Sequence, residues 1–239
     1  MNSVGNPSSV DGGEAGDAST LALDLLLHCT AAALLFCLLS SAEYLVNDVL
    51  DAPQDRLHPT KRNRPIASGL LPAPLALGAA AVLLVVGLAG CYLVTPLLAV
   101  VGAAYAGMMV AYSLGLKHQV IIDVFIIAGG FVLRAAAGAV AISVPVSPWL
   151  YVCTVLGALF VALAKRRSEL TLLQAGAGSH RRNLDEYSIA LVDQMINVVT
   201  PSTVIAYSLY TFTAENLPGN RAMMVTIPFV LYGVFRYLY

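Results

Sequence analysis

Oxygen-bearing side chains recur at helical spacing in one short segment, as Asn47, Asp48, Asp51 and Asp55. On a helix the three aspartates share one face, and Asn47, Asp51 and Asp55 form a stripe at four-residue spacing. Like charges so arranged repel one another, so we expect a cation among them. Ligand sets made only of oxygen favour hard cations such as Mg²⁺, which also binds substrate phosphates. We therefore predict a magnesium site at these four residues, called here the aspartate stripe; the alternative is a solvated acidic loop.

A basic segment follows the aspartate stripe directly and carries Arg56, Lys61, Arg62 and Arg64. Guanidinium and ammonium groups beside a metal–carboxylate cluster suit the outer oxygens of a diphosphate. For any single one of these residues the alternative is an ordinary anchor at the membrane surface.

Two charged residues lie inside an apolar segment, at Asp123 and Arg134. They are eleven positions apart and therefore lie on nearly the same helical face. An arginine inside a membrane span costs about 2.5–3.5 kcal/mol on insertion scales, so Arg134 should face a wet cavity or a partner. We expect Tyr112 and Lys117 to reach the same cavity. The alternative is a structural ion pair with another helix.

A second group of charged residues lies further along the chain, at Lys165, Arg166, Arg167, Arg181, Arg182 and Asp185, followed by Tyr187. It is mainly cationic, with only two adjacent acids in the later part. Asp193, further on, we expect to hold helices together. The chain has no Gly-x-Ser-x-Gly, P-loop or His-Glu-x-x-His pattern, which argues against serine hydrolysis, nucleotide-driven pumping and zinc chemistry.

These residues must be positioned by membrane helices. Hydrophobic residues make up 58% of the chain and charged residues 11%, against about a quarter charged in soluble domains. Lipid offers the backbone no hydrogen bonds, so the apolar blocks should be helices. We predict an all-α, polytopic transmembrane bundle with seven spans: Leu21–Val46, Pro74–Val94, Pro96–Leu114, Val120–Ser143, Pro148–Lys165, Tyr187–Phe212 and Ala222–Tyr239. Residues 1–20 should form a disordered polar tail, and residues 21–239 the transmembrane domain.

The distribution of positive charge predicts the orientation. Ten of the thirteen lysines and arginines fall on one side of the predicted bundle: Arg56, Lys61, Arg62, Arg64, Lys117, Lys165, Arg166, Arg167, Arg181 and Arg182. The positive-inside rule makes this side cytoplasmic, which gives a multi-pass protein of the plasma membrane with its working face in the cytoplasm. The net charge of −1 carries no information about nucleic acid, but the sequence has no basic domain and no interleaving of aromatic and basic residues, so we exclude nucleic acid as a partner. Homo-oligomer formation is compatible with the sequence.

The segment Asn47–Asp55 resembles the first signature of the UbiA superfamily of membrane prenyltransferases. Within that superfamily, the runs His58–Gly69, Tyr112–Gly138 and Lys165–Tyr187 resemble decaprenyl-phosphate phosphoribosyltransferases. The superfamily fold has nine spans and opens with an Arg-Pro-x-Gln-Trp-type stretch that is absent here, and Tyr239 falls within a span. We therefore expect this chain to lack the first and last helices of the fold.

The resemblance implies Mg²⁺ at the aspartate stripe, with Asp48, Asp51 and Asp55 as catalytic residues. It implies contacts with phosphoribosyl diphosphate or the lipid phosphate from a set of mostly basic residues: Lys61, Arg62, Arg64, Tyr112, Lys117, Asp123, Arg134, Lys165, Arg166, Arg167, Arg181, Arg182, Asp185 and Tyr187. The expected activity is a magnesium-dependent membrane glycosyltransferase that moves 5-phosphoribose to a polyprenyl phosphate, for cell-wall arabinan.

Two alternatives stay open. The first is transfer of a prenyl chain from its diphosphate to an aromatic or alcohol acceptor. Enzymes of that kind usually carry a second Asp-x-x-x-Asp motif, where this chain has Arg181, Arg182 and Asp185. The second is a transporter or a non-catalytic membrane protein, which would be expected to show polar groups near the membrane midplane and internal repeats.

Overall fold

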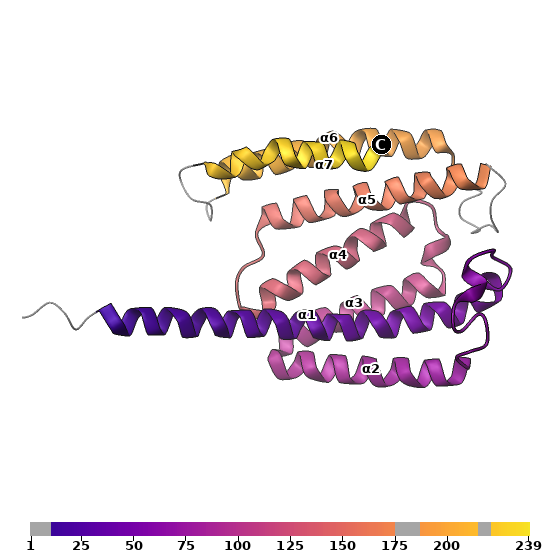
Figure 1. Ribbon diagram of the computed structural model, residues 1–239, viewed down its shortest axis with the longest axis horizontal. Coiled ribbons are helices and arrows are strands. Elements are labelled where there is room, and N and C mark those ends of the chain that lie inside the picture. Colours follow the sequence, from indigo (N-terminus) through magenta and orange to yellow (C-terminus); the bar gives the residue numbers. More distant parts are fainter. Residues whose placement is uncertain (1–10, 175–186, 215–220) are drawn as a thin grey trace, which may run out of the picture.

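The computed structural model describes residues 11–174, 187–214 and 221–239, and within these ranges the chain forms helices joined by turns and short irregular segments. The long helices run side by side along one direction (Figure 1). They are α1 (Asp11–Asp55), α2 (Ala73–Val94), α3 (Pro96–Leu114), α4 (Ile122–Ala141), α5 (Pro148–Gln174), α6 (Ile189–Thr213) and α7 (Ile227–Leu238), with short 3₁₀ turns η1 (Lys61–Asn63), η2 (Leu116–His118) and η4 (Ala222–Thr226). The all-α fold predicted from the sequence is confirmed.

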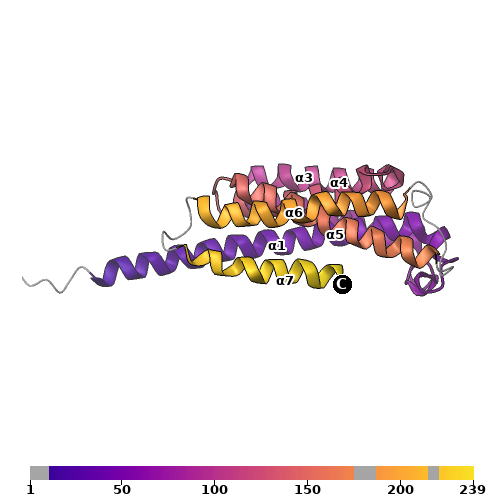
Figure 2. The same cartoon turned by 90° about the horizontal axis from the view of Figure 1, so that it is seen from above.

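Helix α1 is longer than the predicted first span at both ends. It begins at Asp11, within the segment expected to be a polar tail, and continues through the aspartate stripe to Asp55. Pro53 lies in its last turn, where its ring leaves the carbonyl of Val49 without the usual hydrogen bond from a backbone N–H four residues later. Both views show that the N-terminal part of α1 extends beyond the other helices (Figures 1 and 2).

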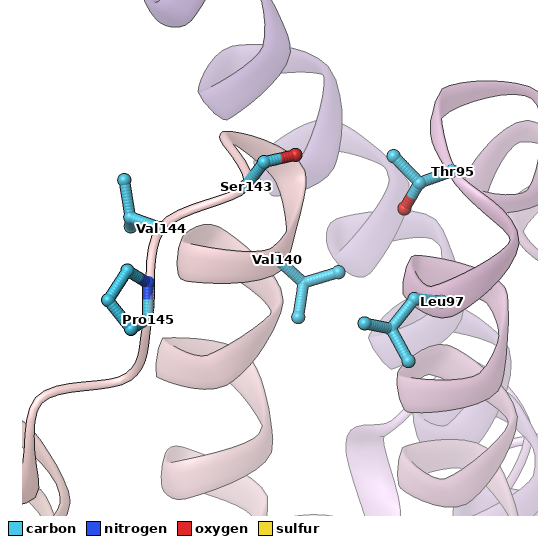
Figure 3. Close-up of a pocket in the computed structure, with 6 residues that line it drawn as sticks. All are labelled: Thr95, Leu97, Val140, Ser143, Val144 and Pro145. Carbon is cyan, nitrogen blue, oxygen red and sulfur yellow. The ribbon is translucent and has the colours of Figure 1, made fainter.

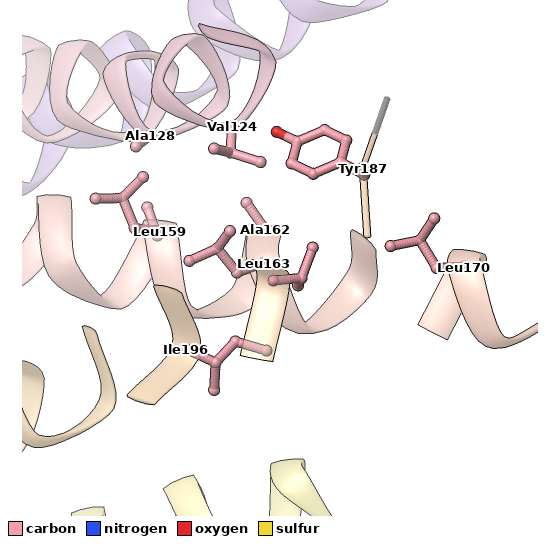
Figure 4. Close-up of a cluster of buried hydrophobic side chains, with 10 residues drawn as sticks. Val124, Ala128, Leu159, Ala162, Leu163, Leu170, Tyr187 and Ile196 are labelled. Carbon is pink, nitrogen blue, oxygen red and sulfur yellow. The ribbon is translucent and has the colours of Figure 1, made fainter. Parts of the chain in front are cut away.

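The bundle has two main apolar cores. The first joins α1 to α2, α3 and α4 through residues such as Phe36, Leu39 and Tyr105. Helix α2 approaches α1 closely because Gly87 has no side chain; a Cβ there would lie 2.8 Å from a methyl carbon of Leu39. The second core joins α4, α5 and α6 and includes Val124, Leu163, Val192 and Tyr187. In Figure 4 the Tyr187 ring lies at the edge of this core, beside α4.

The outer surface of the bundle is apolar, as a bilayer requires. Six helices are long and apolar enough to cross a membrane, and many of their large side chains are exposed, such as Leu34, Val85 and Val100. Six of the seven predicted spans are therefore confirmed. The seventh is a shorter apolar helix, because Ala222–Thr226 forms a 3₁₀ turn before α7. The chain is an integral membrane protein.

The two ends of the bundle differ in chemistry. The C-terminal ends of α1, α3 and α5 lie at one end, together with the basic loop after α1 (Figure 1). The turns α2–α3 and α4–α5 lie at the other end and bound a hollow lined by Thr95, Leu97, Val140, Ser143, Val144 and Pro145 (Figure 3). No charged side chain lines this hollow, whereas the opposite end carries the aspartate stripe and the basic loop.

Candidate active site at the charged end of the bundle

The aspartate stripe lies on the last three turns of α1, as predicted. Because the helix is continuous to Asp55, the spacing of the four residues brings their side chains to one region. Asn47 Nδ2 donates to Asp51 Oδ2 at 3.0 Å, and Asp55 is buried with 5% of its surface exposed. The stripe thus begins within the membrane-spanning helix and ends at the loop that follows it.

Arg64 returns from the loop to the stripe. Its Nη1 donates to Asp48 Oδ1 and to Asp55 Oδ2, each at 2.9 Å. The loop is held in this path by Ile66, which packs with residues of α1 and α2, and by Arg56 Nε, which donates to Ala67 O at 3.1 Å. One guanidinium group therefore bridges two carboxylates and offsets part of their mutual repulsion.

Lys117 approaches the stripe from the turn η2, after α3. Its Nζ forms an ion pair with Asp51 Oδ1 and lies 3.2 Å from Asn47 Oδ1. Ser113 Oγ also donates to Asn47 Oδ1, at 3.4 Å. Lys117 has only 3% of its surface exposed, and a buried ammonium group requires such partners. The ammonium group of Lys117 thus lies on the stripe. That it also reaches a cavity near Asp123 stays a prediction.

The stripe therefore carries three carboxylates and two bound cations. The positive charge expected among these carboxylates comes from the chain itself, from Arg64 and Lys117. Within the described ranges, no three acidic, histidine or cysteine side chains converge as a ready ligand set for a metal. The side chains of the stripe nonetheless offer only oxygen atoms, from three carboxylates and one amide. These oxygen atoms fit Mg²⁺ once Arg64 and Lys117 leave them and pair with another anion.

A second charged cluster joins α4, α5 and the segment just before α6. Asp123 is fully buried and accepts from Arg166 Nη2 through Oδ2 and from Tyr187 Oη through Oδ1, the latter at 2.8 Å. Arg166 also pairs with Glu169, one turn along α5. Tyr187 Oη accepts the backbone N–H of Ile121 at 2.6 Å. Burial raises the pKa of Tyr187 to about 12, so its hydroxyl keeps the proton that it donates to Asp123.

The side chains of Asp123 and Arg134 contact different residues, contrary to the expectation from their helical spacing. Asp123 is paired with Arg166, which is the structural alternative considered for it. The Arg134 side chain bends along α4, where Nε donates to Gly130 O at 3.2 Å. Its guanidinium carbon lies 4.8 Å from the Phe131 ring centroid and 5.4 Å from that of Tyr105. Aromatic rings and a helix carbonyl thus supply the contacts that a membrane-embedded arginine needs.

The remaining predicted residues are spread over the charged end. Arg167 Nε pairs with Asp193 Oδ1 at 2.6 Å, which confirms that Asp193 links α6 to α5. Tyr112 is buried, whereas Lys61, Arg62 and Lys165 are exposed. Predicted residues that lie outside the described part of the chain are Arg181, Arg182 and Asp185.

Two residues at this end of the chain were not predicted: Ser113, which contacts the stripe, and Glu43, a buried acid one helical turn before it. Ser113 bonds Asn47, and no local pattern reveals a contact between α3 and α1. Glu43 lies four residues before Asn47 and is 5% exposed, with no hydrogen-bond partner for Oε2 among the described residues. An acidic residue within an apolar span, at the spacing of the stripe, was a signal for Glu43.

The fold and this site define an all-helical integral membrane protein whose charged end carries an oxygen-rich aspartate cluster. Over residues 15–237 the chain matches the UbiA prenyltransferase family, and it belongs to that family. It is 37% identical over 215 residues to the decaprenyl-phosphate phosphoribosyltransferase of Mycobacterium tuberculosis, an alignment that covers 90% of this chain and 71% of the relative. The enzyme of the same name from Corynebacterium glutamicum is 35% identical over 217 residues, covering 89% and 65% of the two chains.

Solved structures show the same fold. A UbiA homolog from Archaeoglobus fulgidus, bound to GPP and Mg²⁺, superposes with a TM-score of 0.74 at 18% identity. The superposition covers 88% of this chain and 74% of the homolog. The arrangement of helices found here is therefore that of the UbiA fold.

Proposed function

We propose that the protein transfers a 5-phosphoribosyl group from phosphoribosyl diphosphate to a polyprenyl phosphate, such as decaprenyl phosphate, in the membrane. The observation that carries the proposal is the 35–37% identity to decaprenyl-phosphate phosphoribosyltransferases over about nine-tenths of the chain. The family match spans residues 15–237 and so includes the aspartate stripe, Arg64 and Lys117.

Asn47, Asp48, Asp51 and Asp55 are the residues that would hold Mg²⁺, because they supply the oxygen donors that this ion prefers. When bound, Mg²⁺ would neutralise the diphosphate and stabilise the charge that develops on it as it leaves. The structural neighbour with Mg²⁺ and a diphosphate ligand supports this assignment through its fold.

Arg64 and Lys117 are the residues best placed to act on the diphosphate. Both already lie at the carboxylates, at distances of about 3 Å or less. An incoming diphosphate offers them oxygen atoms in place of the carboxylates, and charge-assisted hydrogen bonds to phosphate are strong. In this exchange the two side chains release the stripe and hold the leaving group.

The reaction breaks the bond between the anomeric carbon of ribose and the diphosphate oxygen, and inorganic diphosphate leaves with both bonding electrons. An oxygen of the lipid phosphate then forms the new bond to the same carbon. A phosphate monoester is already ionised at neutral pH and needs no strong base. The contribution of the protein is therefore orientation and electrostatic stabilisation.

The site faces the cytoplasm in this proposal. The residues that carry it lie at the end of the bundle where the basic loops gather, and the positive-inside rule assigns that end to the cytoplasm of the cell. A water-soluble donor then approaches from the cytoplasm while the lipid acceptor stays in the membrane. The product would serve as an arabinose donor precursor for the cell wall.

Transfer of a prenyl chain is the competing reaction, and the donor distinguishes the two. Membranes that contain the protein are supplied with Mg²⁺, polyprenyl phosphate and phosphoribosyl diphosphate labelled in the ribose. Label should enter the organic-soluble lipid fraction, and Asp48→Asn should prevent this transfer. The control Arg221→Ala, which changes a residue between α6 and α7, should leave it unchanged. Prenylation of an aromatic acceptor from a prenyl diphosphate, without label in lipid, would assign the competing reaction.

A further inference from the structure

The turn that carries Lys117 ends in an unusual backbone conformation. Ile121 has φ +70° and ψ −45°, although it is β-branched and such residues rarely adopt positive φ. A conformation of this kind persists only where surrounding contacts hold it, and such positions cluster at functional sites.

The contacts that hold Ile121 come from the buried cluster of charged residues. The backbone N–H of Ile121 donates to Tyr187 Oη at 2.6 Å, and the same hydroxyl donates to Asp123 Oδ1 at 2.8 Å. Asp123 is in turn bound by the buried guanidinium group of Arg166, whose charged carbon lies 5.9 Å from the centre of the Tyr187 ring. A chain of contacts thus runs from Arg166 on α5 through Asp123 on α4 and Tyr187, just before α6, to one backbone amide.

The turn between Ile121 and Lys117 transmits this constraint. His118 N donates to Gly115 O at 2.9 Å, Gln119 N to Leu116 O at 3.1 Å, and Asp123 N to Gln119 O at 3.1 Å. The segment has little freedom to move one end without the other, because successive hydrogen bonds join η2 to the first turn of α4. The position of the Lys117 ammonium group therefore depends on the conformation at Ile121.

We propose that Tyr187, Asp123 and Arg166 are positioning residues, which hold the Ile121 turn so that Lys117 reaches the aspartate stripe. They act through Lys117 and make no contact with the substrate. This inference rests on the proposed function for the role of Lys117 toward the diphosphate. It gives Tyr187 and Arg166 a role different from the substrate contacts that the sequence suggested.

The test is Tyr187→Phe, with Tyr207→Phe as the matched control. Tyr207 also uses its hydroxyl between elements, with its Oη 2.7 Å from Thr226 Oγ1, but it lies outside this cluster. Tyr187→Phe should raise the KM for phosphoribosyl diphosphate about tenfold, which is the size of effect expected when a buried hydrogen bond is lost. It should leave the KM for lipid phosphate unchanged. It should also speed hydrogen exchange at the Ile121 amide, measured in detergent by mass spectrometry. Tyr207→Phe should change neither quantity.

A second substitution separates positioning from substrate contact. Ile121→Gly in the Tyr187→Phe protein should restore most of the lost donor affinity, because glycine adopts positive φ without strain. If affinity is not restored, Tyr187 contacts the donor itself and the positioning role is wrong. Unchanged exchange at Ile121 in Tyr187→Phe would overturn the inference in any case. If the unsubstituted protein transfers no phosphoribose, the proposed function fails, and the exchange experiment still decides the inference.

Discussion

At the scale of single residues, the site is defined by which charges meet. Three carboxylates of α1 are bound by Arg64 and Lys117, which come from two different loops. The two cations offset two of the three negative charges before substrate arrives, and they are the groups that a diphosphate would take over. The carboxylates and the cations should therefore respond differently to substitution.

Removing a carboxylate should abolish turnover. Asp51→Asn keeps the size of the side chain but removes a metal ligand and the partner of Lys117, so transfer should fall by about a hundredfold or more. The control is Asp193→Asn, because the exposed ion pair between Asp193 and Arg167 should contribute little. Initial rates at several Mg²⁺ concentrations check the prediction, and full activity of Asp51→Asn would refute the site.

Removing a cation should separate metal binding from catalysis. In Lys117→Met the carboxylate of Asp51 loses its competing partner, so Mg²⁺ in the absence of diphosphate should bind about tenfold more tightly. Transfer should nevertheless fall, because the ammonium group no longer holds the leaving diphosphate. Calorimetric titration with Mg²⁺ measures the first effect. Weaker Mg²⁺ binding in Lys117→Met would show that the lysine supports the metal site and does not compete with it.

The sequence predicted the stripe but not its partners. Asn47, Asp51 and Asp55 were recognisable because helical spacing is a local property. The contact between Asp51 and Lys117 joins residues 66 positions apart, so it depends on how α3 packs against α1. For the same reason the spacing of Asp123 and Arg134 was misleading: a shared helical face does not imply shared neighbours.

At the scale of elements, the helices could be predicted well and their ends less so. The bounds of α3 were predicted to the residue because Pro96 begins the helix and Gly115 follows its end. Helix α1 runs past its predicted span because the stripe itself is helical, although polar residues resemble a loop in composition. The final span was interrupted by η4, for which hydropathy provides no signal.

The junction of α4, α5 and α6 should have a characteristic pH dependence. Burial raises the pKa of Tyr187 to about 12, above the usual value of about 10 in an unfolded chain. Between these values the folded protein keeps a proton that the unfolded chain loses, so this contribution to stability is present below pH 10 and is lost toward pH 12. The loss of thermal stability between pH 10 and pH 12, measured in detergent, should therefore be smaller for Tyr187→Phe than for Tyr207→Phe, which keeps the Tyr187 hydroxyl. Equal losses would contradict the buried setting of Tyr187.

At the scale of the whole molecule, the bundle separates a charged end from an apolar one. Its outer surface is apolar along six helices, and the charged side chains that carry the site gather at the ends of α1, α3 and α5. Composition and charge distribution were sufficient to predict this arrangement, because both are imposed by the bilayer and not by detailed packing.

The orientation can be tested by labelling single cysteines. In a variant with Cys29, Cys37, Cys91 and Cys153 replaced by alanine, Gln54→Cys lies at the charged end and Val146→Cys at the other. An impermeant thiol reagent should label Val146→Cys from outside intact cells and Gln54→Cys only in inverted vesicles. The reverse pattern would place the active site outside the cell.

The most direct test of the central claim is product analysis with the purified protein in lipid vesicles. With Mg²⁺, phosphoribosyl diphosphate and polyprenyl phosphate present, one inorganic diphosphate should be released for each lipid that gains a phosphoribosyl group, as measured by mass spectrometry. Omitting either substrate should stop both. Release of diphosphate from a prenyl diphosphate, with an aromatic acceptor prenylated and no sugar on the lipid, would contradict the account.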